Sequence, residues 1–154
     1  MKTRKKTADR IIGRLRAVGS IRTDDDRQIL TILPVYREGM LGMDAFSHLW
    51  VLYWFHENDD RSSRSVLKVH PRKDPANPLT GVFGTRSPMR PNLVGLDLCR
   101  VREVRTETGE VVVEGCQARD GTPLVDIKPY LPHSDRVTPV RLPAWARRRP
   151  RRQP

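Results

Sequence analysis

The stretch that decides the fold is His48-Leu-Trp-Val-Leu-Tyr-Trp-Phe-His56, in which seven consecutive apolar or aromatic residues lie between two histidines. Aromatic and β-branched residues favour strands, so this stretch predicts a strand over 48–55. Its apolar residues do not alternate with polar ones, which predicts burial on both faces. A second subunit would cover one face, and we therefore expect a homodimer. Cover by the protein's own loops is the alternative.

Short strand-like runs surround this segment, separated by Gly, Pro and Asp. No long amphipathic helix is evident, and only 38–46 resembles a helical turn. The other runs cover 17–22, 28–35, 66–69, 81–85, 93–104, 111–116 and 124–127. The sequence thus predicts a mostly β fold, a small closed or nearly closed β-barrel of about eight strands with a short helical turn.

The charge of the chain is concentrated at its two ends. At 154 residues the chain is about one domain long, and its net charge is +11. Residues 1–16 hold seven Lys/Arg against one Asp, and residues 141–154 hold six Arg and no acid, so each end carries +6 and residues 17–140 carry −1. We expect a basic N-terminal arm (1–16), a barrel domain (17–140) and a disordered Arg-rich tail (141–154). The tail is either a solvated end or an arm that grips RNA, and the two roles are compatible.

Several common classes of site are not predicted. The sequence has no phosphate-binding glycine loop, zinc-protease motif, serine-hydrolase motif or calcium loop, and Asp24-Asp25-Asp26 indicates an acidic turn. Cys99 and Cys116 have no metal-ligand spacing, which argues against a metal site or a disulfide framework. No signal peptide or membrane span is predicted. We therefore expect a soluble protein of the reducing cytoplasm.

Two stiff, cationic loops are the strongest functional signal in the residues themselves. They cover 70–78 and 85–92 and contain five prolines, at 71, 75, 78, 88 and 91. Proline fixes φ and reduces the entropy lost on ordering, so such loops hold side chains still. Arg86 and Arg90 are thus placed to bind a carboxylate or phosphate. Alternatively, these arginines pin the loops together by pairing with Asp74, Asp97 or Asp120.

Three long strings carry a family resemblance: AFSHLWVLYWFHE, HPRKDPANPLTGVFGTRSPMRPNLVGL and DGTPLVDIKPYLP. They resemble, in order and spacing, the signatures of the TsaA-like family, over about residues 18–133. The resemblance implies a dimeric β-barrel that binds S-adenosylmethionine without a Rossmann fold. It also implies methylation of the exocyclic nitrogen of threonylcarbamoyladenosine beside the anticodon of tRNA.

The resemblance also implies roles for individual residues. Cofactor contacts are expected from His56, Glu57, Arg86, Leu96, Asp120, Gly121, Thr122 and Pro123. Substrate or dimer contacts are expected from Arg90, Asn92, Lys128 and Tyr130. Asp126 is a candidate general base for the acceptor nitrogen, or else a structural carboxylate that pairs with Lys128.

Three features depart from the family pattern. The chain has Ile21-Arg22-Thr23-Asp24-Asp25-Asp26 where the family has a Ser-Pro-Tyr/Phe-like turn and a longer Pro-Arg-Gln loop. Leu93 replaces a proline, and an arginine-rich tail follows the barrel where longer members have a further domain. These differences concern the substrate, so two alternatives stay open: a non-catalytic RNA-binding or assembly protein, and a methyltransferase for another RNA or a small metabolite.

Overall fold

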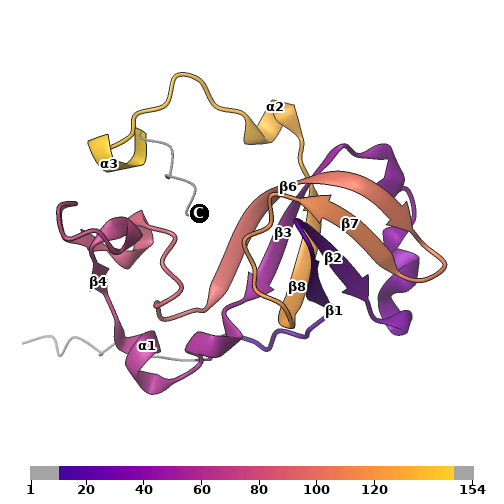
Figure 1. Cartoon of the computed structure of the whole chain (residues 1–154), viewed down its shortest axis with the longest axis horizontal. Coiled ribbons are helices and arrows are strands. Elements are labelled where there is room, and N and C mark those ends of the chain that lie inside the picture. Colours follow the sequence, from indigo (N-terminus) through magenta and orange to yellow (C-terminus); the bar gives the residue numbers. More distant parts are fainter. Residues whose placement is uncertain (1–10, 148–154) are drawn as a thin grey trace, which may run out of the picture.

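Six antiparallel strands close into a barrel in the computed structural model, which describes residues 11–147. In barrel order these are β1 (Gly19–Asp24), β2 (Arg27–Ile32), β7 (Glu110–Glu114), β6 (Val94–Arg105), β3 (His48–Trp54) and β8 (Thr122–Pro129) (Figure 1). Pairing of β1 with β8, at Gly19 opposite Leu124, completes the ring. The predicted closed β-barrel is therefore confirmed, with six strands in its wall.

The interior of the barrel is filled by alternate side chains of the strands. Leu49, Val51 and Tyr53 of β3 point inward and are buried. They contact a core that also contains Ile21, Leu30, Ile32, Met40, Cys99, Val111, Val113 and Leu124. The side chains between them on β3 are only half-buried. The expectation that β3 is buried on both faces is thus wrong within one chain, because its second apolar face lies on the outside of the barrel.

The two remaining strands lie outside the barrel, in an arm that spans residues 56–92. They are β4 (Lys68–Val69) and β5 (Thr80–Gly81), which pair only with each other. The arm also holds the helix α1 (Arg61–Ser65) and short 3-10 helices at His56–Asn58, Pro71–Lys73 and Val82–Gly84. Figure 1 shows this arm beside the barrel, so two of the eight expected strands do not contribute to the wall.

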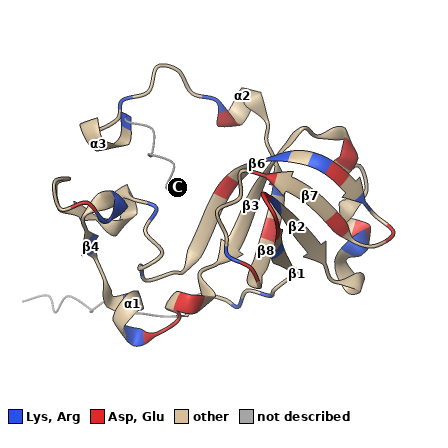
Figure 2. Cartoon of the chain, viewed as in Figure 1, with Lys and Arg blue, Asp and Glu red and all other residues tan. Residues whose placement is uncertain are grey.

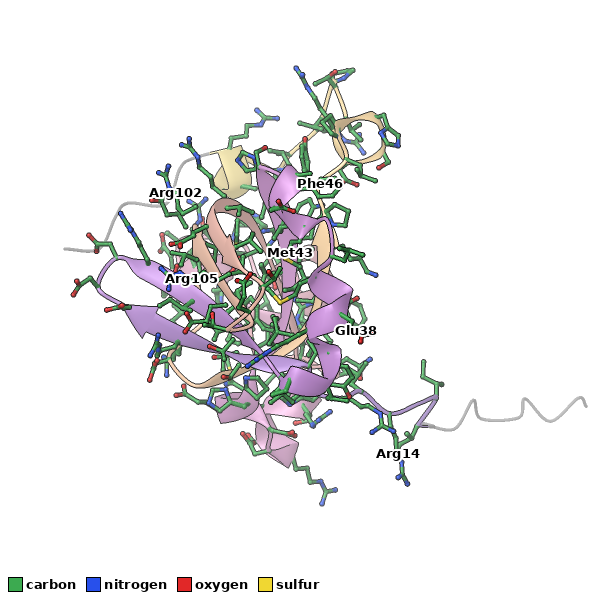
Figure 3. All side chains as sticks on the ribbon, turned by 90° about the vertical axis from the view of Figure 1, so that its right-hand side faces the viewer. Arg14, Glu38, Met43, Phe46, Arg102 and Arg105 are labelled. Carbon is green, nitrogen blue, oxygen red and sulfur yellow. The ribbon has the colours of Figure 1, made fainter. Side chains whose placement is uncertain are left out.

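Proline explains where the second predicted strand ends. The expected strand 28–35 stops at Ile32, because Pro34 begins a 3-10 helix, Pro34–Met40, whose buried Met40 contacts the core. A second 3-10 helix, Met43–Ala45, follows, so the helical turn expected over 38–46 is present but starts earlier. Figure 3 shows Glu38 and Met43 on this segment, beside the barrel.

The described parts of the terminal segments contain little regular structure. Two single-turn helices follow β8, α2 (Pro132–Asp135) and α3 (Ala144–Arg147), and residues 11–18 have no helix. Residues 1–10 of the predicted basic N-terminal segment and residues 148–154 of the predicted tail lie outside the described residues. None of the helices in the described part is long and apolar enough to cross a membrane. The acidic stretch 24–26 forms the β1–β2 turn, as expected, with Asp25 at a positive φ of 50°.

A glycine lets β6 approach the ring of Tyr53 closely. Gly95 lies opposite Tyr53 in the β3–β6 register, and a Cβ added at Gly95 would overlap the Tyr53 ring carbons. Gly95→Ala should therefore destabilise the barrel by about 1–3 kcal/mol through overpacking. Urea unfolding measures this free energy. The matched control is Gly39→Ala, because nothing lies within 4 Å of a Cβ there. Equal midpoints for the two variants would contradict the expectation.

Candidate functional site

Two adjoining cavities lie where the arm meets the barrel. The first has a volume of about 490 Å³ and the second about 410 Å³. Tyr53, Phe55, Pro88 and Gln117 line both cavities, so these residues form a shared partition. One wall of the site is thus the end of β3, and another is the proline-rich loop 85–92.

Arg90 holds the loop 85–92 in shape. Its Nε donates to the carbonyl oxygen of Ser87 at 2.7 Å, and its Nη2 donates to those of Val82 at 2.7 Å and Thr85 at 2.6 Å. Bonds from a charged donor are stronger than bonds between neutral groups. Arg90 therefore pins the loop, as one sequence alternative suggested, but it does so through backbone carbonyls and not through an aspartate.

A second arginine ties the end of this loop to the arm, and no sequence motif indicated it. Arg64 of α1 donates to the carbonyl oxygen of Pro91 at 2.9 Å and to Asp59 at 2.8 Å. Its guanidinium also lies 5.3 Å from the centroid of the Trp54 ring, a distance at which cation–π attraction acts. The α1 turn that carries Arg64 starts at Asp60, whose carboxylate accepts from the Ser63 N–H.

Arg86 is the cation that this loop leaves available. Its side chain is exposed, lines the first cavity, and makes no hydrogen bond or ion pair with any residue in the range 11–147. Leu96 lines the same cavity, opposite Leu52 on β3. The structure thus brings two of the residues expected to bind the cofactor, Arg86 and Leu96, into one largely apolar pocket that carries a positive charge.

Three other expected cofactor residues line the second cavity: His56, Glu57 and Thr122. Glu57 is paired with Arg119. Lys73, which adopts a positive φ of 56°, lines the same cavity. The residues expected to bind the cofactor are therefore not gathered around one cavity: two of them line the first cavity and three line the second.

The turn 119–123 is bound to β1. Asp120 Oδ1 accepts from the Thr23 N–H at 2.9 Å, and the Gly121 N–H donates to the Ile21 carbonyl at 2.8 Å. Gly121 has a positive φ of 76°, a conformation that favours glycine. Neither of the two cavities described above is lined by Asp120, Gly121 or Pro123. These residues position Thr122, which lines the second cavity.

A buried carboxylate of the first cavity contacts two residues of the partition. Asp97 is 6% exposed, and its Oδ2 accepts from the Tyr53 hydroxyl at 2.9 Å and from the Gln117 N–H at 2.7 Å. Burial, together with this carboxylate, raises the pKa of Tyr53 well above its usual value. From the sequence, Asp97 was expected only as a possible partner for an arginine. Its position between Gly95 and Cys99, on the inward face of β6, is the pattern that could have indicated a buried carboxylate.

The remaining predicted residues lie away from the cavities. Asp126 Oδ2 pairs with Lys128 Nζ at 3.0 Å, and Asp126 Oδ1 accepts from the Ile127 N–H, so both carboxylate oxygens have donors. Tyr130 contacts the rings of His48 and Trp50 at centroid distances of 6.4 and 6.1 Å. Asn92 is exposed at the end of the loop 85–92.

Both cysteines are free and buried. They contact each other through their thiols, and this contact together with burial raises the pKa of Cys99. No cluster of His, Cys, Asp or Glu that could hold a metal ion is found within residues 11–147.

Comparisons with known proteins identify the family of this chain. The model of the tRNA-methyltransferase O N-terminal domain family matches residues 19–136. A probable S-adenosyl-L-methionine-binding protein of Methanocaldococcus jannaschii is 37% identical over 114 residues, which are 74% of this chain and 89% of that protein. The tRNA (adenine(37)-N6)-methyltransferase of Escherichia coli is 40% identical over 100 residues, 64% of this chain and 42% of that enzyme.

Solved structures show the same fold. A crystal structure of TrmO from Pseudomonas aeruginosa superposes with a TM-score of 0.67 at 27% identity, covering 89% of this chain and 63% of that chain. The present chain therefore spans less than two thirds of the length of that protein and less than half of the Escherichia coli enzyme.

If Arg90 holds the loop 85–92 as described, its removal should loosen this loop alone. Arg90→Ala should raise the amide hydrogen-exchange rates of residues 82–92, because three carbonyl contacts are lost. Exchange in β1, β2 and β7 should not change. Mass spectrometry of peptic peptides measures both, with Arg141→Ala, an exposed site, as the control. Unchanged exchange over 82–92 would show that the prolines alone fix the loop.

Proposed function

Because the chain belongs to the tRNA-methyltransferase O N-terminal domain family, we propose that it is an S-adenosylmethionine-dependent methyltransferase that acts on the N6 position of adenosine 37 in tRNA. The acceptor implied by the sequence motifs is the exocyclic nitrogen of threonylcarbamoyladenosine, next to the anticodon. The observation that carries the proposal is the cavity at the arm–barrel junction, where two residues of the family's cofactor set, Arg86 and Leu96, meet.

The residues present fit S-adenosylmethionine chemically. This molecule has an adenosine, a sulfonium and an amino-acid end, and it needs apolar contacts, hydroxyl acceptors and a cation for its carboxylate. The first cavity offers Leu52, Phe55 and Leu96 as apolar surface and Arg86 as the cation. Glu57, in the second cavity, is suited to accept from ribose hydroxyls. When bound, the cofactor supplies an electrophilic methyl group.

The protein's contribution to the reaction is mainly alignment. Arg90 and Arg64 keep the loop 85–92 fixed, so Arg86 can hold its ligand without first ordering the loop. Asp126 as general base for the acceptor nitrogen stays a prediction. The ion pair between Asp126 and Lys128 supports the alternative that Asp126 is a structural carboxylate. Lys128 then binds Asp126 and not the substrate.

We propose that the basic ends increase the affinity for tRNA by binding its phosphates, independently of the nucleotide sequence. The division into a basic N-terminal arm (1–16), a barrel domain (17–140) and an Arg-rich tail (141–154) is part of this proposal. In the described part of the tail, Arg141 and Arg147 are exposed. A cytoplasmic location is proposed as well, and it is supported by the two cysteines, which remain free thiols.

Calorimetry with S-adenosylmethionine tests the cofactor. The wild-type protein should bind it, and Arg86→Ala should weaken binding roughly 10-fold or more, because a charge-assisted contact to the carboxylate is lost. Arg147→Ala is the matched control and should leave cofactor affinity unchanged while lowering affinity for tRNA. Absence of binding at high protein concentration would contradict the proposed function.

Methyl transfer is tested with labelled S-adenosylmethionine and bulk tRNA from cells that lack a tRNA-methyltransferase O of their own. Incorporation of methyl at adenosine 37 would support the proposal. Cofactor binding without incorporation into tRNA would instead favour one of the two alternatives: an RNA-binding or assembly protein, or a methyltransferase for a different acceptor.

The outer face of β3 and β6 supports a homodimer. Trp50 lies opposite Leu98, and Leu52 opposite Leu96, with both leucines of β6 39% exposed. These side chains form an apolar patch that continues into the first cavity, which Leu52 and Leu96 line, and such patches on a protein surface mark interaction sites. A second copy of the chain is the occupant that we propose, since a self-complementary apolar face is what a two-fold dimer needs.

Light scattering tests the dimer. The wild type should have the mass of a dimer at micromolar concentration, and Leu98→Lys should be a monomer, because a lysine would be desolvated in the interface. Leu41→Lys is the control, because Leu41 is 92% exposed on a turn outside this face. A wild-type monomer would contradict the dimer.

A further inference from the structure

The first cavity contains charges of both signs. Three charged residues line it: Arg86, Arg90 and Asp97. The guanidinium of Arg90 is occupied by carbonyls through Nε and Nη2. Arg86 and Asp97 are therefore the pair of opposite charges that the cavity can offer to a ligand.

Asp97 differs from an ordinary structural carboxylate in how its oxygens are used. Oδ2 accepts from both Tyr53 and Gln117, whereas Oδ1 accepts from no N–H or O–H group of the residues in the range 11–147. The thiol of Cys116 also lies against this carboxylate. Oδ1 is not among the described side-chain atoms that are both buried and without a partner, so it keeps contact with solvent. Because little water reaches a carboxylate that is 6% exposed and lines the cavity, a cationic group of a ligand can interact strongly with it there.

The two charges do not neutralise each other. Arg86 makes no ion pair with Asp97 or with any other residue of the described part. Tyr53 and Gln117 hold the Asp97 side chain, and the loop that Arg90 fixes holds the backbone of Arg86. A cavity with a separate cation and anion matches a zwitterion, and an α-amino acid carries both of its charges on one carbon atom.

We propose that Asp97 is a specificity residue of this site that receives the ammonium group of the amino-acid end of the methyl donor, while Arg86 receives the carboxylate. The proposal rests on the proposed function, since it assumes that S-adenosylmethionine binds. It adds a residue outside the set that the family resemblance implies. Asp97 acts in binding and not in the transfer step, so no proton or electron moves through it.

A series of ligands separates the two ends of the donor. S-Adenosylhomocysteine keeps both charged groups and lacks the sulfonium charge. Decarboxylated S-adenosylmethionine keeps the ammonium and lacks the carboxylate, and 5′-methylthioadenosine lacks the whole amino-acid end. The dissociation constants of S-adenosylmethionine and of these three ligands are measured by calorimetry for the wild-type chain, Asp97→Asn and Arg86→Ala.

Asp97→Asn should weaken S-adenosylmethionine, S-adenosylhomocysteine and the decarboxylated donor to a similar extent, roughly 10- to 100-fold, because all three carry the ammonium. It should leave 5′-methylthioadenosine unchanged within about twofold. Arg86→Ala should weaken only the two ligands that carry a carboxylate. In Asp97→Asn the amide oxygen of the introduced side chain can still accept from Tyr53 and Gln117, which keeps the partition in place.

Tyr53→Phe controls for damage to the partition. It removes one donor from Oδ2 but keeps the carboxylate, so it should alter thermal stability without the selective pattern across ligands. Uniform weakening of all four ligands in Asp97→Asn, including 5′-methylthioadenosine, would overturn the proposal by assigning Asp97 a purely structural role. Weakening of S-adenosylmethionine far beyond S-adenosylhomocysteine would overturn it by placing Asp97 at the sulfonium.

The outcomes also keep the two proposals apart. If the wild type binds none of the ligands, the proposed function fails. If the wild type binds them all and Asp97→Asn binds them equally well, only the role of Asp97 fails. A selective loss that follows the ammonium supports both.

Discussion

The closure of the barrel between β1 and β8 is the constraint on which the site depends. The ladder is short, with three residue pairs from Gly19–Leu124 to Ile21–Thr122. It is extended at one end by the Val18 N–H bond to Leu124 and at the other by Asp120, which accepts from the Thr23 N–H. The chain from 117 to 122 must therefore run along the end of β3. Gln117 and Thr122 become cavity walls because the ring closes at this point.

Much of the barrel could be predicted because its strands carry strong local signals, and the errors have identifiable physical causes. The segment β3 has apolar residues on both faces, so its period of two is invisible in sequence, and only the barrel shows which face is inside. Residues 66–69 and 81–85 have strand-like composition, but only 68–69 and 80–81 form strands, which pair with each other outside the wall, and 82–84 form a 3-10 helix. Local propensity does not specify which partner a strand finds.

The site was predictable in its residue types and less so in its contacts. The prolines indicated a rigid loop, and the structure shows that an arginine expected to contact the substrate or the partner subunit donates to carbonyls of this loop instead. A guanidinium can donate to carbonyls as well as to carboxylates, so the sequence does not show which of Arg86 and Arg90, four positions apart, contacts the loop. Leu93, where the family pattern has proline, is fully buried, and its carbonyl accepts from the Phe55 N–H. It anchors the loop to the barrel by burial where proline would restrict the backbone.

The distribution of charge explains why the barrel and the termini can serve different purposes. Two of the three arginines of β6 are paired, Arg102 with Glu114 and Arg105 with Glu103 and Glu110. Figure 2 shows charges of both signs on β6 and β7. Paired surface charges contribute little net field at a distance. The field that attracts a polyanion must then come from the basic termini, while the barrel stays near neutral.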